Sequence, residues 1–255
     1  IKNLPKFEKF LDLTIDEQTK DITTKDNKSL VINGFDLNAI EAALSLKDEY
    51  GAKVTIISFG EVESQNGLKK PLAMGADEAV LLNKPVSFVD PVTTAFFLSK
   101  AIKLYHPFDL ILCGRQASDW DNSEVPFRIA EHLNISCISL ASKIEINESM
   151  VIVTRALPNG FQRAKTNLPC LITITNEFGE PRYPNLKGIM SANKKNIKQI
   201  TSTMLGINES DIKPKTEIIK INFQTRNKNC EFIQSDNNEY SAQLLTEKLQ
   251  TLKLL

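Results

Sequence analysis

Two short segments combine glycine and polar residues at positions where strands are expected to end. Val31–Asp36 leads from a strand into a helix, so its free backbone N–H groups would favour an anion or an adenine edge. Gly114 follows an apolar run and, without a Cβ, would let a ligand approach the backbone. Gln116, Asn122 and Ser123 follow, ahead of a predicted helix whose start suits a phosphate. The simpler alternative is that Asn122 and Ser123 only cap that helix, because capping uses the same groups.

Composition excludes several classes of function. The 255 residues hold 31 basic and 31 acidic side chains, and a net charge of zero argues against non-specific binding to nucleic acid or to an anionic membrane. No stretch approaches the roughly 18–20 apolar residues of a membrane-spanning helix. His106 and His132 are the only histidines, which excludes a multi-histidine metal site, and none of the four cysteines forms a C-x-x-C pair. We therefore predict no metal site and no catalytic residue.

The ten glycines exclude the common phosphate-binding loops. No two of them have the spacing of G-x-G-x-x-G or of G-x-x-x-x-G-K-[ST], so the usual dinucleotide fingerprint and the Walker loop are absent. The S-G-G-x-D-S loop of ATP pyrophosphatases is missing as well, which argues against an adenylate-forming enzyme. Any nucleotide would have to be held by other loops.

The elements that must position these loops alternate along the first half of the chain. Helical spacing predicts helices at 36–50, 66–74 and 90–105, and β-branched or apolar runs predict strands at 53–58, 78–82 and 109–113. Asp36 and Asp90 are expected to cap the helices that begin there, with Pro91 in the first turn of the second. This alternation predicts an α/β fold with a doubly wound, mostly parallel sheet. Such sheets bind ligands beyond the carboxyl ends of their strands, which adds the loop around Phe59 to the two named above.

The second half of the chain follows a different pattern. Short strands are predicted at 144–147, 151–157, 161–164 and 170–175, several of them in hairpins, and they would be added at the edge of the sheet or wrap it. Residues 186–255 hold eleven Lys or Arg against seven Asp or Glu, with apolar residues too scattered for a core of their own. We predict a nucleotide-binding domain over 1–185 and an arm over 186–255 that packs on another chain. A flexible tail is the alternative.

Four segments, in order, resemble the beta subunit of electron-transferring flavoproteins. Asn33–Leu44 resembles the family's N-P-F-D-x-x-A-x-E-x-A-L, and Leu72–Asp77 matches its L-A-M-G-A-D throughout. Asp109–Asp121 resembles D-L-I-L-x-G-[KR]-Q-A-x-D-x-D, and Glu180–Met190 resembles E-P-R-Y-x-x-L-x-x-I-M. The resemblance covers residues 1 to about 195. It also implies that about half a dozen residues of a first strand precede Ile1.

The resemblance implies an adenine-nucleotide α-hydrolase-like fold and a redox role. The chain would pair with an alpha subunit that holds most of an FAD, and would pass electrons from an acyl-CoA dehydrogenase to a downstream acceptor in the cytoplasm, or in the mitochondrial matrix of a eukaryote. The flavin would supply the chemistry. The chain's own pocket would hold AMP or a second FAD, with Asn33, Gly34, Phe35, Asp36, Phe59, Gly114, Arg115, Gln116, Ala117, Asp119, Asp121, Asn122, Ser123, Glu124 and Val125 as the candidate lining.

The choice between AMP and a second FAD stays open. Members with AMP tend to read D-D-D-x-N-Q-T after Gln-Ala, and members with a second FAD, which can bifurcate electrons, read D-G-D-T-A-Q-V-G-P. Val125 favours the second type, whereas Trp120, Asn122 and Glu124 fit neither. Trp120 could stack on a ring or simply cover the loop. A carboxylate at Glu124 would repel a phosphate unless it turns away.

The last of the four segments implies a docking site. In the family, the loop after E-P-R-Y presents one leucine to an apolar pocket of an acyl-CoA dehydrogenase, which points to Leu186 with Tyr183, Ile189 and Met190 around it. From the residues alone, Leu186 could equally be folded into the arm's own packing. The alternative function is an adenine-nucleotide-sensing module of the universal-stress type, a homodimer without flavin. That alternative leaves the Glu180–Met190 segment and the arm without a purpose.

Overall fold

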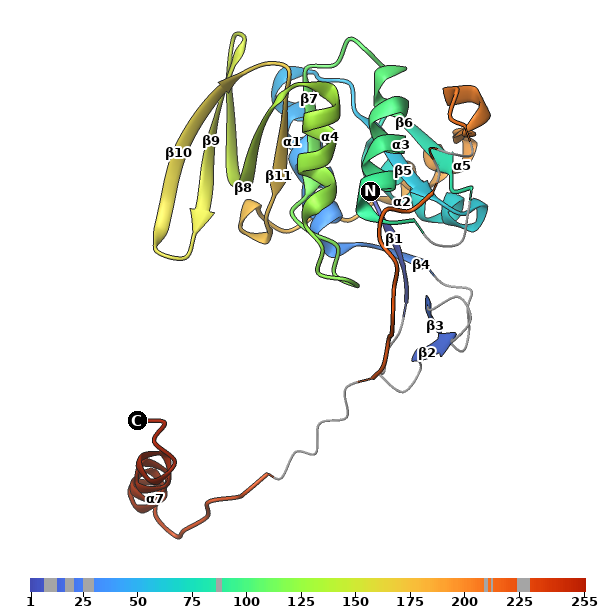
Figure 1. The fold of residues 1–255 in the computed structure, drawn as a ribbon. Coiled ribbons are helices and arrows are strands. Elements are labelled where there is room, and N and C mark those ends of the chain that lie inside the picture. The colour runs from blue at the N-terminus through green and yellow to red at the C-terminus, as the bar shows by residue number, and fades with distance from the viewer. Residues whose placement is uncertain are drawn as a thin grey trace. The chain divides into compact units, whose positions relative to one another are not determined.

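The computed structural model describes residues 1–6, 13–16, 21–24, 30–85, 89–208, 211, 213–223 and 230–255. Its first compact unit is Ile1–Lys220, and Ile221–Leu255 forms a second one. The first unit has the predicted α/β fold, with parallel strands flanked by helices (Figure 1). Among the residues described in this unit, the helices are α1 (Gly34–Tyr50), α2 (Lys69–Met74), α3 (Pro91–Lys103), α4 (Glu124–Leu133) and α5 (Leu186–Lys194), with 3-10 turns at Val62–Leu68, Asn176–Phe178 and Thr203–Leu205.

A five-stranded sheet combines a parallel part and an antiparallel part. Its order is β10 (Gly160–Asn167), β9 (Met150–Leu157), β8 (Ser136–Asn147), β11 (Cys170–Ile174) and β7 (Leu110–Gly114). β8 to β10 form the added hairpins that the sequence predicts. The prediction was wrong for β11, which lies between β8 and β7 and is parallel to both. All five β11 residues are buried, as expected for a strand with both faces covered.

The remaining strands of the first unit form shorter ladders. β5 (Thr55–Gly60), β6 (Glu78–Asn83) and β12 (Lys198–Ile200) are parallel, with β6 in the middle. β1 (Asn3–Pro5) pairs antiparallel with β4 (Leu30–Ile32), and β2 (Leu13–Asp16) with β3 (Asp21–Thr24). Among the described residues, the parallel strands thus form two ladders rather than one sheet.

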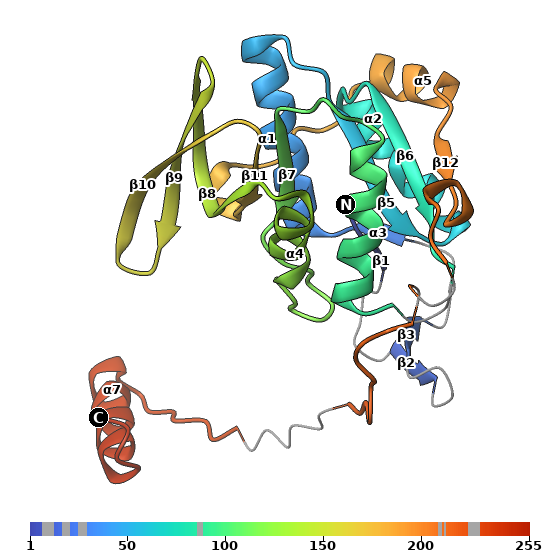
Figure 2. The ribbon, with the colours of Figure 1, turned by 45° about the horizontal axis from the view of Figure 1, so that its top comes forward.

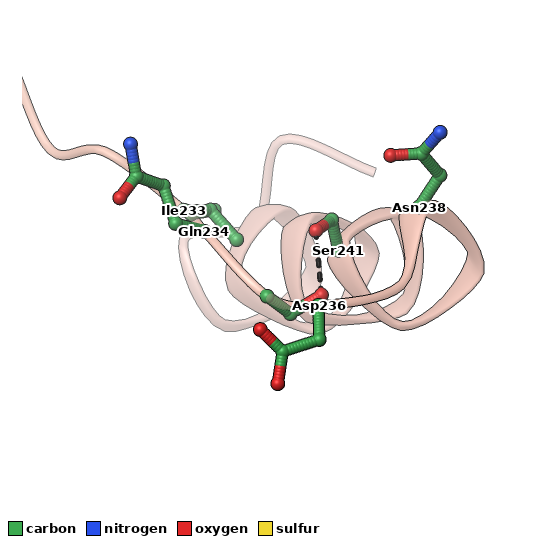
Figure 3. Close-up of a pocket in the computed structure, with 6 residues that line it drawn as sticks. Ile233, Gln234, Asp236, Asn238 and Ser241 are labelled. Carbon is green, nitrogen blue, oxygen red and sulfur yellow. Dashed lines mark hydrogen bonds between the residues drawn. The ribbon is translucent and has the colours of Figure 1, made fainter.

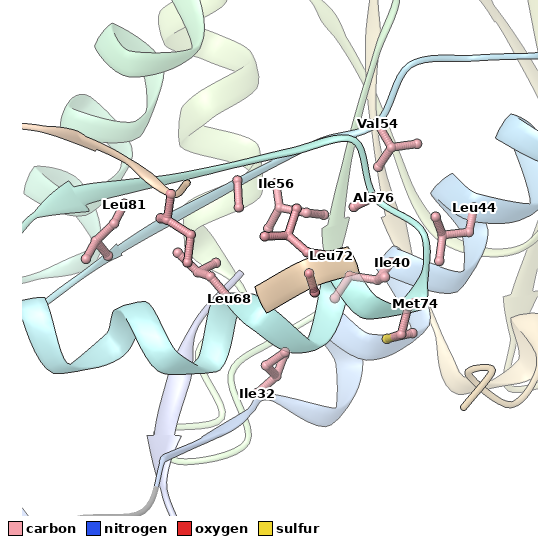
Figure 4. Close-up of a cluster of buried hydrophobic side chains, with 13 residues drawn as sticks. Ile32, Ile40, Leu44, Val54, Ile56, Leu68, Leu72, Met74, Ala76 and Leu81 are labelled. Atoms are coloured by element: carbon pink, nitrogen blue, oxygen red, sulfur yellow. The ribbon is translucent and has the colours of Figure 1, made fainter. Parts of the chain in front are cut away.

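Helix α1 contributes to two of the buried clusters. Ile40 and Leu44 pack with Val54 and Ile56 of the β5 region, a cluster that also takes in α2 (Figure 4). Ala39, Ala42 and Leu46 pack with buried residues of β11, β8 and β9. α3 and α4 lie side by side (Figures 1 and 2) and share a third cluster. α1 therefore joins the two ladders through its own buried side chains.

Asp90 fixes the end of the first unit. Its buried carboxylate caps α3 by accepting from the N–H of Thr93 (2.8 Å), as the sequence predicts, and also accepts from the N–H groups of Lys215 (2.6 Å) and Thr216 (3.0 Å).

Since α5 and β12 pack on α2 and β6, the first unit extends to Lys220, beyond the predicted boundary after residue 185. In the second unit, the helix α7 (Asn238–Thr251) buries no residue.

Candidate functional site: two bonded loops at the start of α1 and an exposed docking segment

The two loops expected to form the nucleotide pocket are bonded to one another. Asn33, only 2% exposed, donates from Nδ2 to the carbonyl oxygen of Gln116 (2.8 Å) and accepts at Oδ1 from the N–H of Ser118 (3.2 Å). Asp36 accepts from the N–H groups of Gly114 (3.1 Å) and Lys2 (2.7 Å). The structure therefore brings these two loops together. The polar atoms of Asn33 and Asp36, however, bind protein groups and so position the loops.

Gly114 makes room for the first turn of α1. A Cβ added to Gly114 would lie 2.5 Å from Oδ1 of Asp36 and 2.7 Å from the carbonyl carbon of Phe35. The close packing of α1 on β7 therefore requires glycine at this position, and whether a ligand also approaches the backbone of Gly114 stays a prediction. The space beside Gly34, in contrast, is open, since no atom lies within 4 Å of its Cβ position.

The loop after Gly114 is organised by contacts among its own side chains. Arg115 lies over the ring of Phe35, with its Cζ 4.8 Å from the ring centroid, and donates from Nε to Oε1 of Gln116 (2.9 Å). The Gln116 amide in turn donates to Asp121, and the N–H of Ala117 donates to the carbonyl oxygen of Asn122 (3.0 Å). These bonds fold residues 115–122 into a compact turn.

One contact to this loop was missed by sequence reasoning. Lys2 pairs with Asp119, at 2.6 Å between Nζ and Oδ2, so a residue near the start of the chain neutralises one carboxylate of the loop. The partners are 117 positions apart, and no local signal connects them.

The start of α4 is compatible with a phosphate. Asn122, the residue before the N-cap Ser123, accepts at Oδ1 from the N–H of Glu124 (2.8 Å), whereas Ser123 makes no side-chain cap bond. The Glu124 carboxylate turns along the helix to Arg128 (2.6 Å), which reduces the repulsion that a free carboxylate would cause. The Ser123 hydroxyl makes no hydrogen bond to the described residues. A hydroxyl and a helix N-terminus are the groups that bind an anion.

Two further predicted residues lie in apolar surroundings. Phe59, at the end of β5, stacks on Phe97 with 5.1 Å between ring centroids. Val125 packs against the cluster shared by α3 and α4. Neither side chain offers a polar group, and whether they or the other candidates contact a nucleotide stays a prediction.

The docking segment, Tyr183–Met190, presents apolar side chains to the surface. Tyr183 is 92% exposed, Leu186 75% and Met190 59%, and Ile189 is also exposed. The alternative that Leu186 is folded into the arm's own packing is therefore wrong. Asn185 caps α5 by accepting at Oδ1 from the N–H of Gly188 (2.7 Å), so the segment passes directly from loop to helix at Leu186. A shallow hollow lies beside it, lined by Leu186, Lys187, Met190, Ser191 and Lys194.

An ion-pair network that sequence reasoning missed holds the segment in front of α5. Arg182 donates from Nε (3.0 Å) and Nη2 (2.8 Å) to Glu41 of α1, and from Nη1 to Asp48 (2.8 Å). Burial alone would raise the pKa of Glu41, but the hydrogen bonds and charge of Arg182 outweigh it and lower that pKa. The E-P-R-Y resemblance named Arg182, but only the fold shows its partner.

Other features of the described residues carry less chemistry. No group of three His, Cys, Asp or Glu side chains there could hold a metal ion, and no helix there is long and apolar enough to cross a bilayer. In the second unit, an open polar hollow lies at the start of α7, and two of its lining residues, Ser235 and Ser241, share a hydrogen bond between their hydroxyls (2.7 Å, Figure 3). Asp236 is the ionisable side chain that lines this hollow.

Comparisons with known proteins agree with the resemblance. Residues 22–205 match the model of the electron transfer flavoprotein domain. The chain is 39% identical to an electron transfer flavoprotein subunit beta of Thermoanaerobacterium thermosaccharolyticum, over 79% of this chain and 77% of the relative. It is 34% identical to the subunit of the same name from Bacillus subtilis, over 87% and 86%. A subunit of the caffeyl-CoA reductase–Etf complex of Acetobacterium woodii is 38% identical, over 64% and 63%.

Proposed function

Because the chain belongs to the electron transfer flavoprotein family, as one of its beta subunits, we propose that it carries electrons as half of a heterodimer with an alpha subunit. The electrons would come from a flavin dehydrogenase of the acyl-CoA type and leave to a downstream acceptor. FAD, held mainly by the alpha subunit, supplies the redox chemistry when bound. This chain would contribute one wall of that site, a nucleotide pocket of its own and a docking surface, without acting as a stand-alone catalyst.

The exposed docking segment is the observation that carries this proposal. Tyr183, Leu186 and Met190 expose apolar area on one short segment. A small apolar anchor with a polar surround suits a partner that must bind and leave quickly. A nucleotide-sensing homodimer of the universal-stress type has no use for such a segment, so we rank that function second.

The pocket of the chain itself would hold an adenine nucleotide at the crevice between α1 and α4. Gln116 and Ser123 would face it, and the first turn of α4 would receive a phosphate. Asn33 and Asp36 would act by keeping the two loops together. Val125 favours a second FAD over AMP, whereas Trp120 and Asn122 fit neither pattern, so the two nucleotides are outcomes of one experiment.

That experiment is a count of nucleotides. The chain is purified with its alpha subunit, the complex is denatured, and released FAD and AMP are quantified per heterodimer. Two FAD would place a second flavin in this chain's pocket and support electron bifurcation. One FAD with one AMP would indicate a simple carrier with a structural nucleotide. A stable homodimer that releases no flavin would refute the proposal and favour the nucleotide sensor.

A further inference from the structure

The docking helix α5 is held with little apolar burial. Of its nine residues only Ala192 is buried, in the cluster that contains Leu72 and Met74 of α2. Leu186 and Met190 face outward. A free helix of this length is not stable in water. Contacts other than a hydrophobic face must therefore fix its orientation.

A glycine lets α5 lie directly on the backbone of α2. A Cβ added to Gly188 would lie well under 3.0 Å from the carbonyl oxygen of Ala73, and 3.2 Å from its carbonyl carbon. Ala73 belongs to the segment Leu72–Asp77, which matched the family motif but had no role in the nucleotide crevice. A backbone carbonyl cannot move aside as the end of a flexible side chain can, so the close approach depends on glycine.

Two lysines bond the C-terminal end of α5 to α2 and to the residues directly after α2. Lys69, at the start of α2, donates from Nζ to the carbonyl oxygens of Ala192 (3.1 Å) and Lys195 (2.8 Å). Lys195 donates from its own Nζ to the carbonyl oxygen of Ala76 (2.7 Å). The last carbonyls of a helix lack partners within it, and a cation there satisfies them and complements the helix dipole.

The segment that receives α5 is itself fixed in the core. Leu72 and Met74 are buried, and Asp77 accepts from the N–H of Val54 (2.9 Å) and from Nζ of Lys47 (2.5 Å). α5 therefore rests on a rigid support, and its orientation relative to the first unit is set before any partner arrives.

We propose that Lys69, Gly188 and Lys195 are positioning residues of the docking segment, which hold α5 so that Leu186 and Met190 are presented outward in the free protein. The proposal rests on the proposed function, in which these side chains contact a dehydrogenase. A segment that is already ordered loses less conformational entropy on binding, so a weak and rapid contact becomes adequate for electron transfer. The Leu72–Asp77 motif thereby acquires a role in docking.

The test compares two neighbouring lysines in the purified heterodimer. Lys69→Met keeps the aliphatic stem but removes both bonds to the end of α5. Lys70→Met is the matched control, because Lys70 is exposed on the same helix and bonds to none of the described residues. Lys69→Arg keeps the charge and should retain most of the protection of the α5 amides from exchange. Hydrogen exchange of the amides of residues 186–194 is expected to be about tenfold faster in Lys69→Met and unchanged in Lys70→Met.

A second measurement connects positioning with docking. With a butyryl-CoA-reduced short-chain acyl-CoA dehydrogenase as donor, Lys69→Met should raise the KM for the dehydrogenase about tenfold with little change in kcat. If hydrogen exchange of residues 186–194 is unchanged in Lys69→Met, the positioning role is overturned. It is also overturned if exchange becomes faster in Lys69→Met but the KM for the dehydrogenase does not change, although Leu186→Ala raises that KM. If Leu186→Ala leaves the KM unchanged although Lys69→Met speeds exchange, the docking function fails while α5 is still shown to be held by Lys69.

Discussion

Replacing Gly114 with alanine would test the contact between α1 and β7, which positions the two candidate nucleotide loops. The new Cβ would meet Oδ1 of Asp36 at 2.5 Å, the carbonyl carbon of Phe35 at 2.7 Å and the backbone nitrogen of Asp36 at 2.8 Å. Two of these atoms belong to the backbone and cannot turn away. The first turn of α1 would have to move, and the hydrogen bond from the N–H of Gly114 to Asp36 would lengthen or break.

The expected decrease in the free energy of unfolding follows from the steric clash and from the weakened hydrogen bond. Forcing an extra methyl group into a packed site costs about 1–3 kcal/mol. A hydrogen bond to a charged group contributes about 1.5–3 kcal/mol, of which part is retained after a shift. We expect Gly114→Ala to lower the free energy of unfolding by about 2–4 kcal/mol. For a unit of this size, each kcal/mol lowers the melting temperature by about 2–4 °C.

Urea unfolding of the full chain measures this effect. The fluorescence of Trp120, the single tryptophan, reports on the loop after Gly114. Gly34→Ala is the matched control, because its Cβ would have nothing within 4 Å and it lies at the first position of α1. We expect that control to stay within about 0.5 kcal/mol of the wild type. Equal stability of the two variants would show that α1 does not approach β7 as closely as described, and the reasoning would be refuted.

Three other expectations concern separate parts of the chain. Burial would raise the pKa of Asp90, but its hydrogen bonds outweigh burial and lower that pKa. The ionised carboxylate therefore contributes about 1–3 kcal/mol to the free energy of unfolding above about pH 4, and this contribution is lost on further acidification. Free energies of unfolding in urea should differ between Asp90→Asn and wild type at neutral pH and converge at low pH. Arg182→Lys should cost about 1–2 kcal/mol by the same assay, since lysine cannot bind Glu41 through two nitrogens. Burial raises the pKa of Cys170 to about 11, so mass spectrometry after iodoacetamide treatment at pH 8 should find the exposed Cys230 alkylated and Cys170 unmodified.

Local patterns predicted the elements well where the partners of a residue lie close in sequence. Asp90 followed by Pro91 predicted a cap and a first turn, and the structure has both. Asp36 was expected to cap its helix by the same logic. The helix begins at Gly34 instead, with Asn33 at the cap position, and the Asp36 carboxylate reaches Gly114. A partner 78 positions away leaves no trace in a local pattern.

The same limit explains why the pairing of β11 was predicted wrongly and why the contacts that hold α5 were not predicted. Cys170–Ile174 reads as a short apolar strand, and only the fold shows that it pairs in parallel with β7 and β8. The motif resemblance indicated that Leu186 is exposed, since it identified the docking segment. It could not identify Lys69, which bonds to carbonyl oxygens more than a hundred positions along the chain.

The polar side chains at and after the start of α1 connect this helix to other parts of the first unit. Asn33 binds backbone groups of the loop that follows β7, Asp36 binds the N–H of Gly114 at the end of β7, and Glu41, further along α1, binds Arg182 before the docking segment. Each side chain joins α1 to a different element. In the proposed function a flavin supplies the redox chemistry, so the protein would act by holding distances and orientations. α1 would serve both the candidate nucleotide loops and the docking segment, because this one helix bonds to each of them.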